Sequence, residues 1–139
     1  MRDSTAATRE GTSVMSNTAA SALASDQVID ITTTGRQTGQ PRRIEIWYHR
    51  VAGKYYITGT PGRRSWYANL VAHPEFVFHL KQSATADLAA TARPVTDPAE
   101  REKVLGAILE SLSGLTDAPG RDPAAWVASS PLVEVTFES

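Results

Sequence analysis

TTGRQTGQPRRIEIWYHRVAGKYYITGTPGRRSWYANL, residues 33–70, is the stretch around which the fold of this chain is organised. Residues 42–50 and 54–59 have the alternation of two strands, and the Ala52-Gly53 pair between them suits a two-residue hairpin turn. A loop rich in glycine and arginine lies on each side of this hairpin, at residues 35–43 and 58–65. Glycines let backbone N–H groups turn towards a ligand, and arginines fit phosphate or carboxylate, so both loops suit an anion.

Towards the N-terminus, the chain divides into an arm and a first strand. Residues 1–25 are mostly small and polar, with too few large apolar side chains to offset the entropy of ordering, which predicts a largely disordered N-terminal arm, with a short helix around Thr18 to Leu23 as the alternative. Residues 27–33 are β-branched and place two isoleucines and a threonine on one face, which predicts a strand. We therefore expect one domain, residues 26–139.

Towards the C-terminus, the predicted elements alternate between helix and strand. They are a helix over 66–73 capped by Ser65, strands at 75–81 and 84–95, a helix from a capping box at 97–100 to Leu112, a short helix opening at Asp122-Pro123, and a strand at 132–137. This order is not the regular alternation of strand and helix that is typical of βαβ units. It predicts an α+β fold, an antiparallel sheet or small barrel of about six mainly antiparallel strands with flanking helices.

Charge and composition narrow the classes of function. Residues 35–81 carry eight Lys or Arg and two acids, in a chain whose net charge is -1, which indicates a local anion site. The near-neutral total argues against nucleic acid as a partner. No apolar run is long enough for an integral membrane segment, and cysteine is absent, so we expect a cytoplasmic protein, with association to a membrane surface left open.

Several kinds of catalytic site find no support. The first loop lacks the Gly-Lys-Ser/Thr of a nucleotide-binding P-loop, the three histidines have no metal-ligand spacing, and no Gly-x-Ser-x-Gly elbow is present. The catalytic residue stays unknown, and no metal is expected. On these grounds alone, a plain hairpin loop and a binding loop are equally good interpretations of residues 35–43.

Aromatic side chains gather beside the two basic loops. Trp47 and Tyr48 lie on opposite faces of the strand over residues 42–50, so we expect both of its faces to be covered. Core packing explains many of these rings, but planar rings beside arginines also suit a flat aromatic cofactor with an anionic tail. Trp47 and Tyr48 are therefore candidates for a substrate pocket.

Two motifs resemble the deazaflavin (F-420)-dependent nitroreductase family. The first is TTTGRQTGQPR followed by IEIWY, from residue 32 to residue 48, and the second is WYANLVAHP, residues 66–74. They occur in the family's order and at about its separation. The resemblance implies a split β-barrel related to pyridoxamine-phosphate-oxidase-like proteins. It also implies an oxidoreductase that uses reduced coenzyme F-420 to pass hydride to a small organic acceptor of the quinone, nitroaromatic or enone class.

The same resemblance implies which residues hold the coenzyme. The matching positions, with further donors from the two loops, are Arg36, Thr38, Gln40, Pro41, Arg42, Thr58, Gly59, Thr60, Gly62, Arg63, Arg64, Trp66 and Asn69. Here the second loop is shorter than in the family, so FMN or haem as the cofactor, and a non-catalytic carrier protein, are kept as alternatives. Monomer and homodimer are both left open.

Overall fold

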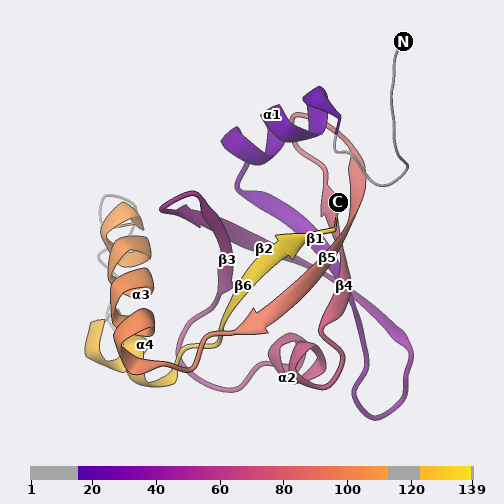
Figure 1. The fold of residues 1–139 in the computed structure, drawn as a ribbon. Helices are drawn as coiled ribbons and strands as arrows, with labels where there is room; N and C mark the ends of the chain where they lie inside the picture. Colours follow the sequence, from indigo (N-terminus) through magenta and orange to yellow (C-terminus); the bar gives the residue numbers. More distant parts are fainter. Residues whose placement is uncertain (1–15, 113–122, 139) are drawn as a thin grey trace.

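Six antiparallel strands form a closed barrel in the computed structural model, which describes residues 16–112 and 123–138. Around the barrel the strands follow the order β1-β2-β3-β6-β5-β4 (Figure 1). The strands are β1 (Val28–Thr34), β2 (Pro41–Val51), β3 (Lys54–Thr58), β4 (Glu75–Leu80), β5 (Ala86–Pro94) and β6 (Leu132–Phe137). The helices are α1 (Asn17–Ser25), α2 (Ser65–Ala72), α3 (Pro98–Leu112) and α4 (Pro123–Ser129). The predicted split-barrel class is confirmed.

The barrel interior is filled by the alternate residues that the strand pattern selects. Ile29 and Ile31 of β1 are fully buried, as are Tyr48 of β2 and Phe78 of β4. The rings of Tyr48 and Phe78 meet edge to face at 5.1 Å, and Phe78 meets Phe137 in the same way at 5.0 Å. Burying each large apolar side chain contributes about 1.5–3 kcal/mol, so this interior dominates the stability of the fold.

Helix α1 revises one expectation from the sequence. Its residues 17–25 lie in the stretch expected to be disordered, yet Ala19, Ala22 and Leu23 are almost fully buried in the barrel core. Ser16 caps the helix by accepting a hydrogen bond from the N–H of Ala19 at 3.1 Å. The expectation failed because three small or medium apolar residues suffice when the barrel end supplies the rest of the contact. Residues 1–15 lie outside the described residues.

Tyr48 links α1 to the barrel, which allows a direct test. Its hydroxyl donates to the carbonyls of Leu23 at 2.9 Å and Ala22 at 3.3 Å, and burial raises its pKa to about 12. Tyr48→Phe removes this hydroxyl, but the Leu23 carbonyl keeps Arg50 as a donor and the Ala22 carbonyl keeps the N–H of Asp26. We therefore expect the free energy of unfolding to fall by about 0.5–1.5 kcal/mol, as for the loss of a hydrogen bond that leaves no buried group unpaired. Urea denaturation measures it. Tyr55→Phe is the matched control, since the Tyr55 hydroxyl has no described hydrogen bond. If both variants lost the same free energy of unfolding, the Tyr48 hydroxyl would not be a specific link between α1 and the barrel.

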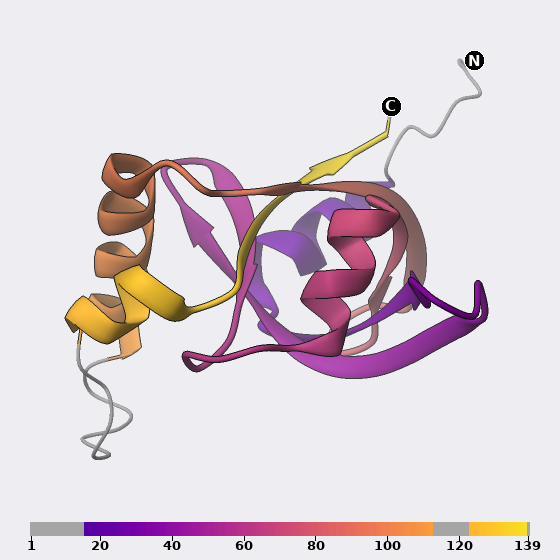
Figure 2. The same ribbon diagram turned by 90° about the horizontal axis from the view of Figure 1, so that it is seen from below.

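Helices α3 and α4 cover one side of the barrel, and α2 lies across one of its ends (Figure 2). A second apolar cluster joins α3 and α4 to the barrel wall and consists of Tyr56, Val95, Val104, Leu105, Ile108, Leu109, Trp126 and Leu132. Asp97 caps α3, as predicted, by accepting from the N–H of Glu100 at 2.9 Å. The Glu100 carboxylate pairs with Arg93 on β5. None of the described helices is long and apolar enough to cross a membrane.

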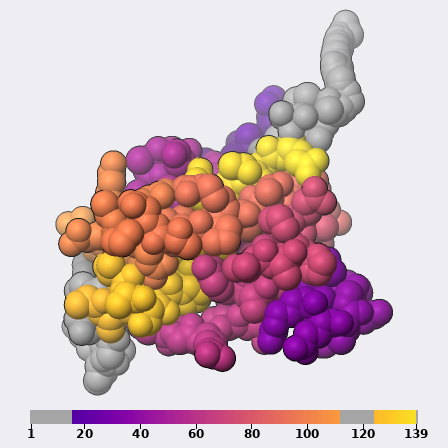
Figure 3. All heavy atoms as spheres, turned by 60° about the horizontal axis from the view of Figure 1, so that its bottom comes forward, coloured from indigo at the N-terminus to yellow at the C-terminus, as the bar shows by residue number. Residues whose placement is uncertain are grey.

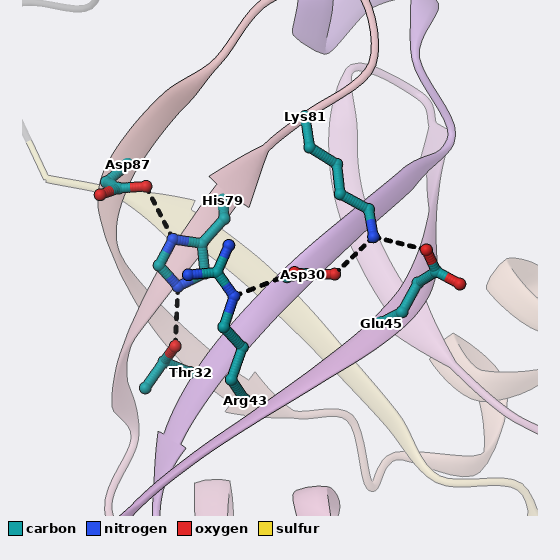
Figure 4. Close-up of polar contacts among 7 residues, drawn as sticks. All are labelled: Asp30, Thr32, Arg43, Glu45, His79, Lys81 and Asp87. Carbon is teal, nitrogen blue, oxygen red and sulfur yellow. Dashed lines mark hydrogen bonds and ion pairs between the residues drawn. The ribbon is translucent and has the colours of Figure 1, made fainter.

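The outer face of β2 is open around Trp47 and is covered by α3 near His49 and Val51, which corrects in part the expectation that both faces of this strand are covered along its length. Trp47 is 43% exposed there. Beside it, Asp30 accepts from Arg43 at 2.9 Å and from Lys81 at 2.7 Å, and Lys81 also pairs with Glu45 (Figure 4). Lys81 and Arg43 hold the pKa of Asp30 below its usual value. This surface satisfies its own charges, so no helix is required to cover it.

His79 belongs to the same outer face and makes two hydrogen bonds there. Its Nε2 lies 2.7 Å from the Thr32 hydroxyl, and its Nδ1 lies 2.7 Å from the Asp87 carboxylate (Figure 4). The three residues come from β1, β4 and β5. Both ring nitrogens are therefore occupied, as expected for a histidine with a packing role.

Candidate functional site

A cavity of about 390 Å³ lies between the β1–β2 hairpin and α2. Its walls are Thr33, Gly35, Arg36, Gln37, Thr38, Arg42, Ile44, Ser65, Trp66 and Asn69. Figure 3 shows this end of the molecule, where the purple hairpin tip projects beside the magenta segment that leads into α2. We call this space the hairpin cavity. It brings together five of the predicted coenzyme-binding residues, namely Arg36, Thr38, Arg42, Trp66 and Asn69.

The loop over residues 35–40 has a closely defined shape. The N–H of Gly35 donates to the carbonyl of Gln40 at 2.8 Å, and the N–H of Gly39 donates to the carbonyl of Gly35 at 2.9 Å. Gly39 has a φ of 71°, which glycine adopts without strain. A Cβ on Gly35 would lie 2.7 Å from the Thr38 hydroxyl, which itself accepts from the N–H of Gln40. Glycine at both positions keeps the loop closed.

Asn69 ties this loop to α2. Its Oδ1 accepts from the backbone N–H of Arg36 at 3.0 Å, and its Nδ2 donates to the Thr33 hydroxyl at 3.1 Å. The side chain is buried, with 5% of the residue exposed. A single amide thus fixes the end of β1, the first loop and α2 relative to one another.

The N-terminal turn of α2 forms the opposite wall. The expected cap, Ser65, is instead the first helical residue, because the N-cap position falls on Arg64, whose side chain makes no capping hydrogen bond. Ser65 and Trp66 therefore border the cavity. N–H groups in the first turn of a helix carry partial positive charge and favour an anion.

The hairpin cavity is electropositive. Arg36 and Arg42 line it without an ion pair among the described residues, and its walls contain no carboxylate. Arg43 lies on the opposite face of β2, where it pairs with Asp30. The strand alternation therefore separates two adjacent arginines, one for the cavity and one for the outer surface.

The second glycine-arginine loop packs mainly against the start of β6. The Thr58 hydroxyl donates to the carbonyl of Pro131 at 2.6 Å. Arg64 donates to the carbonyl of Arg63 at 2.7 Å and also to the Thr60 hydroxyl. Gly59 lies against Pro131. None of these residues of the second loop lines the hairpin cavity.

Five further predicted positions also lie away from the hairpin cavity. Gly62 borders a different cavity together with Arg63, Pro41 borders a pocket formed with β1, β4 and β5, and Gln40 contributes its backbone to the closure of the first loop. Of the two pocket candidates, Trp47 lies on the outer face and Tyr48 is fully buried.

Five cavity residues were not named as site residues, namely Thr33, Gly35, Gln37, Ile44 and Ser65. The period of two could have identified Ile44, which shares a strand face with Arg42. Gly35 was recognised only as part of the loop. The places of Thr33, Gln37 and Ser65 in the cavity wall depend on how α2 packs against the hairpin. No local sequence pattern predicts that packing.

His49 lies elsewhere, facing α3, and burial lowers its pKa to about 4 from the ordinary 6.5, with the charge of Arg50 adding to the effect. Between these values the unfolded chain binds a proton that the folded protein does not. Stability therefore falls as pH decreases from 6.5 towards 4, by at most about 3 kcal/mol.

The test compares urea unfolding of the parent and His49→Gln at pH 7 and pH 5. We expect His49→Gln to reduce the loss of stability between these pH values, whereas His73→Gln, at an exposed position, should keep it. If His49→Gln lost as much stability between pH 7 and pH 5 as the parent does, the burial of His49 would not be the cause of the pH dependence.

Comparison with known proteins identifies the family to which the chain belongs. The family model described as F420H(2)-dependent quinone reductase matches residues 2–117. The chain belongs to this family. It is therefore an oxidoreductase that uses the deazaflavin coenzyme F-420, as the sequence resemblance implied.

Solved structures of related proteins agree on the fold. An F420 reductase is 20% identical, with 91% of this chain and 97% of that chain covered and a TM-score of 0.64. A structure described as F420-H2 dependent reductase (FDR-A) is 22% identical, with coverage of 80% and 95% and a TM-score of 0.52. A pyridoxinephosphate oxidase family protein from Clostridium acetobutylicum is 16% identical, with coverage of 85% and 80% and a TM-score of 0.59. At these identities the likeness shows the shared split barrel.

The hairpin cavity fits the coenzyme of an F420H(2)-dependent quinone reductase. Two arginines without carboxylate partners and a closed glycine loop suit its anionic part, and Trp66 and Ile44 offer apolar surface to a ring. The histidine ligand that haem usually needs is missing, since no histidine lines this cavity. Among the described residues, no group of three His, Asp or Glu side chains could hold a metal ion.

Proposed function

We propose that this member of the family transfers hydride from reduced F-420 to a small organic acceptor of the quinone, nitroaromatic or enone class. We propose that the coenzyme lies in the hairpin cavity, where Arg36 and Arg42 bind its anionic part. The observation that carries this placement is the pair of arginines on a wall without carboxylates. Such a wall suits a phosphate or carboxylate.

The protein's own contribution is to bind, orient and exclude water, because the coenzyme supplies the hydride chemistry when bound. Asn69 and the glycines hold the loop in place before the ligand arrives, which reduces the entropic cost of binding. The cavity walls carry no carboxyl, histidine or tyrosine side chain. We therefore propose that a proton needed by the reduced acceptor comes from solvent.

Titration of the recombinant protein with F-420, FMN and haem tests the cofactor. Oxidation of reduced F-420 is then followed with quinone, nitroaromatic and enone acceptors. We expect F-420 to bind more tightly than FMN or haem and to be oxidised by at least one acceptor class. Preference for FMN or haem would reject the assignment, and F-420 binding without any oxidation would indicate a carrier protein.

A further inference from the structure

Three polar side chains on the outer face of the barrel lie in a row, each on a different strand, namely Thr32, His79 and Asp87 (Figure 4). The Thr32 hydroxyl lies 2.7 Å from Nε2 of His79, and the Asp87 carboxylate lies 2.7 Å from Nδ1. A carboxylate only accepts hydrogen bonds, so Nδ1 carries a proton. In the neutral ring, Nε2 then accepts from the Thr32 hydroxyl. We call these three residues the outer-face relay.

The contacts that fix His79 in place are also those that activate a hydroxyl as a nucleophile. Nε2 can take the hydroxyl proton as the Thr32 oxygen attacks, and the Asp87 carboxylate stabilises the positive charge that the ring then carries. The imidazole is held firmly, since only 6% of His79 is exposed, whereas Thr32 is half-buried and borders a pocket. The nucleophile of the relay therefore lies on the wall of that pocket.

The pocket beside Thr32 has a volume of about 360 Å³, within the range of sites for small organic molecules, about 300–1,000 Å³. We call it the Thr32 pocket. Its walls include Val77 and Ala89, on the strands that carry the other two relay residues. They also include Glu75 and Glu138, which have no ion pair among the described residues, and no Lys or Arg lines the pocket. The Thr32 pocket therefore favours a ligand with positive charge.

Arg43 supplies donors on the other side of Thr32. The two residues are paired directly between β1 and β2, and the Arg43 side chain lies on the outer face with the relay. Only its Nε donates to Asp30, at 2.9 Å, so its two Nη groups have no partner among the described residues. Donors of this kind stabilise a carbonyl oxygen that gains negative charge during attack.

We propose that the outer-face relay hydrolyses small carboxylic esters and thioesters whose leaving group carries a positive charge and lies in the Thr32 pocket. The Thr32 oxygen bonds to the acyl carbon while its proton passes to Nε2 of His79, and Arg43 donates to the carbonyl oxygen. The bond from the acyl carbon to the leaving oxygen or sulfur breaks, and His79 returns the proton to that atom. Water, deprotonated by His79, then releases the carboxylic acid and restores the hydroxyl. Neither step uses F-420, so this activity is independent of the proposed function.

Hydrolysis of acetylthiocholine by the full chain at pH 7, without coenzyme, tests this activity through the thiol that is released. The chain has no cysteine, so a thiol reagent detects only the product. We expect Thr32→Val and His79→Gln each to lower kcat/KM at least about hundred-fold. Asp87→Ala should lower it about ten-fold, since the Asp87 side chain is 72% exposed and its charge is screened. Thr32→Ser keeps the hydroxyl and should remain active.

The matched neutral substrate is dimethylbutyl thioacetate, in which a carbon atom replaces the ammonium nitrogen of acetylthiocholine. We expect its KM to be about three- to ten-fold higher, because charge pairs at exposed carboxylates are weak. The double variant Glu75→Gln/Glu138→Gln should remove this difference and leave hydrolysis of the neutral substrate unchanged. Equal KM values for the two substrates in the parent would overturn the positively charged leaving group.

Matched controls are Thr136→Val and His73→Gln, at exposed positions outside the relay and the Thr32 pocket, and both should hydrolyse acetylthiocholine like the parent. The proposal is overturned if the parent does not exceed the buffer rate, if Thr32→Val or His79→Gln keeps the parent rate, or if the controls lose as much as these variants. An inactive Thr32→Ser that unfolds in urea like the parent overturns it too. Oxidation of reduced F-420 without ester hydrolysis would reject only this proposal.

Discussion

Arg42→Ala is expected to weaken F-420 binding by at least about ten-fold, whereas Arg43→Ala should change it little. Arg42 lines the hairpin cavity and has no ion pair among the described residues, so its guanidinium is available to an anionic ligand. Loss of a charge-assisted contact typically costs about 1.5–3 kcal/mol, which corresponds to roughly ten- to hundred-fold in affinity. Arg43 points to the outer face and pairs with Asp30 at 2.9 Å.

Fluorescence titration of both variants and the parent with F-420 measures the effect. The pair is well matched, because the two arginines are adjacent in one strand and carry the same charge. Arg43→Ala removes an exposed ion pair, so its own effect on stability should stay within about 1 kcal/mol. Three equal affinities would remove the anion site from the hairpin cavity, and a larger loss in Arg43→Ala would move it to the outer face.

Local patterns in the sequence predicted the strands well, most clearly β1, although β3 and β4 each end in a run of three buried residues. In β1 the buried and half-buried residues alternate without exception, and α3 begins at the predicted capping aspartate. The first glycine-arginine loop was likewise predicted from local sequence to be an anion site, since its glycines and Arg42 lie within eight residues, and this assignment stays a prediction. These features depend on neighbours within a few residues.

Features that depend on distant contacts could not be predicted. Helix α1 is stabilised by the barrel end that it covers, and nothing within residues 17–25 indicates that partner. The second loop is rich in glycine and arginine like the first, but its hydrogen bonds to Pro131 and Ser129 direct it towards the end of α4. Equal chemistry in two loops therefore leads to two separate cavities, and only the fold decides which arginine belongs to which.

Asn69 should affect folding and binding together, because its amide joins the two walls of the hairpin cavity. Asn69→Leu leaves the N–H of Arg36 and the hydroxyl of Thr33 without their partner. Each such loss costs about 1–3 kcal/mol, so we expect the free energy of unfolding to fall by about 2–4 kcal/mol. F-420 affinity should fall at least about ten-fold, since the loop that carries Arg36 is no longer held.

Asn69→Asp separates the two roles of this side chain. A carboxylate can still accept from the N–H of Arg36, and the Thr33 hydroxyl can donate to it, so both hydrogen bonds are retained with the direction of one reversed. Its negative charge faces Arg36 and Arg42 and competes with the anionic coenzyme. We therefore expect Asn69→Asp to keep more stability than Asn69→Leu in urea unfolding and yet to bind F-420 at least about ten-fold more weakly than the parent. Parent-like F-420 binding by Asn69→Asp would show that the coenzyme's charge lies away from this wall.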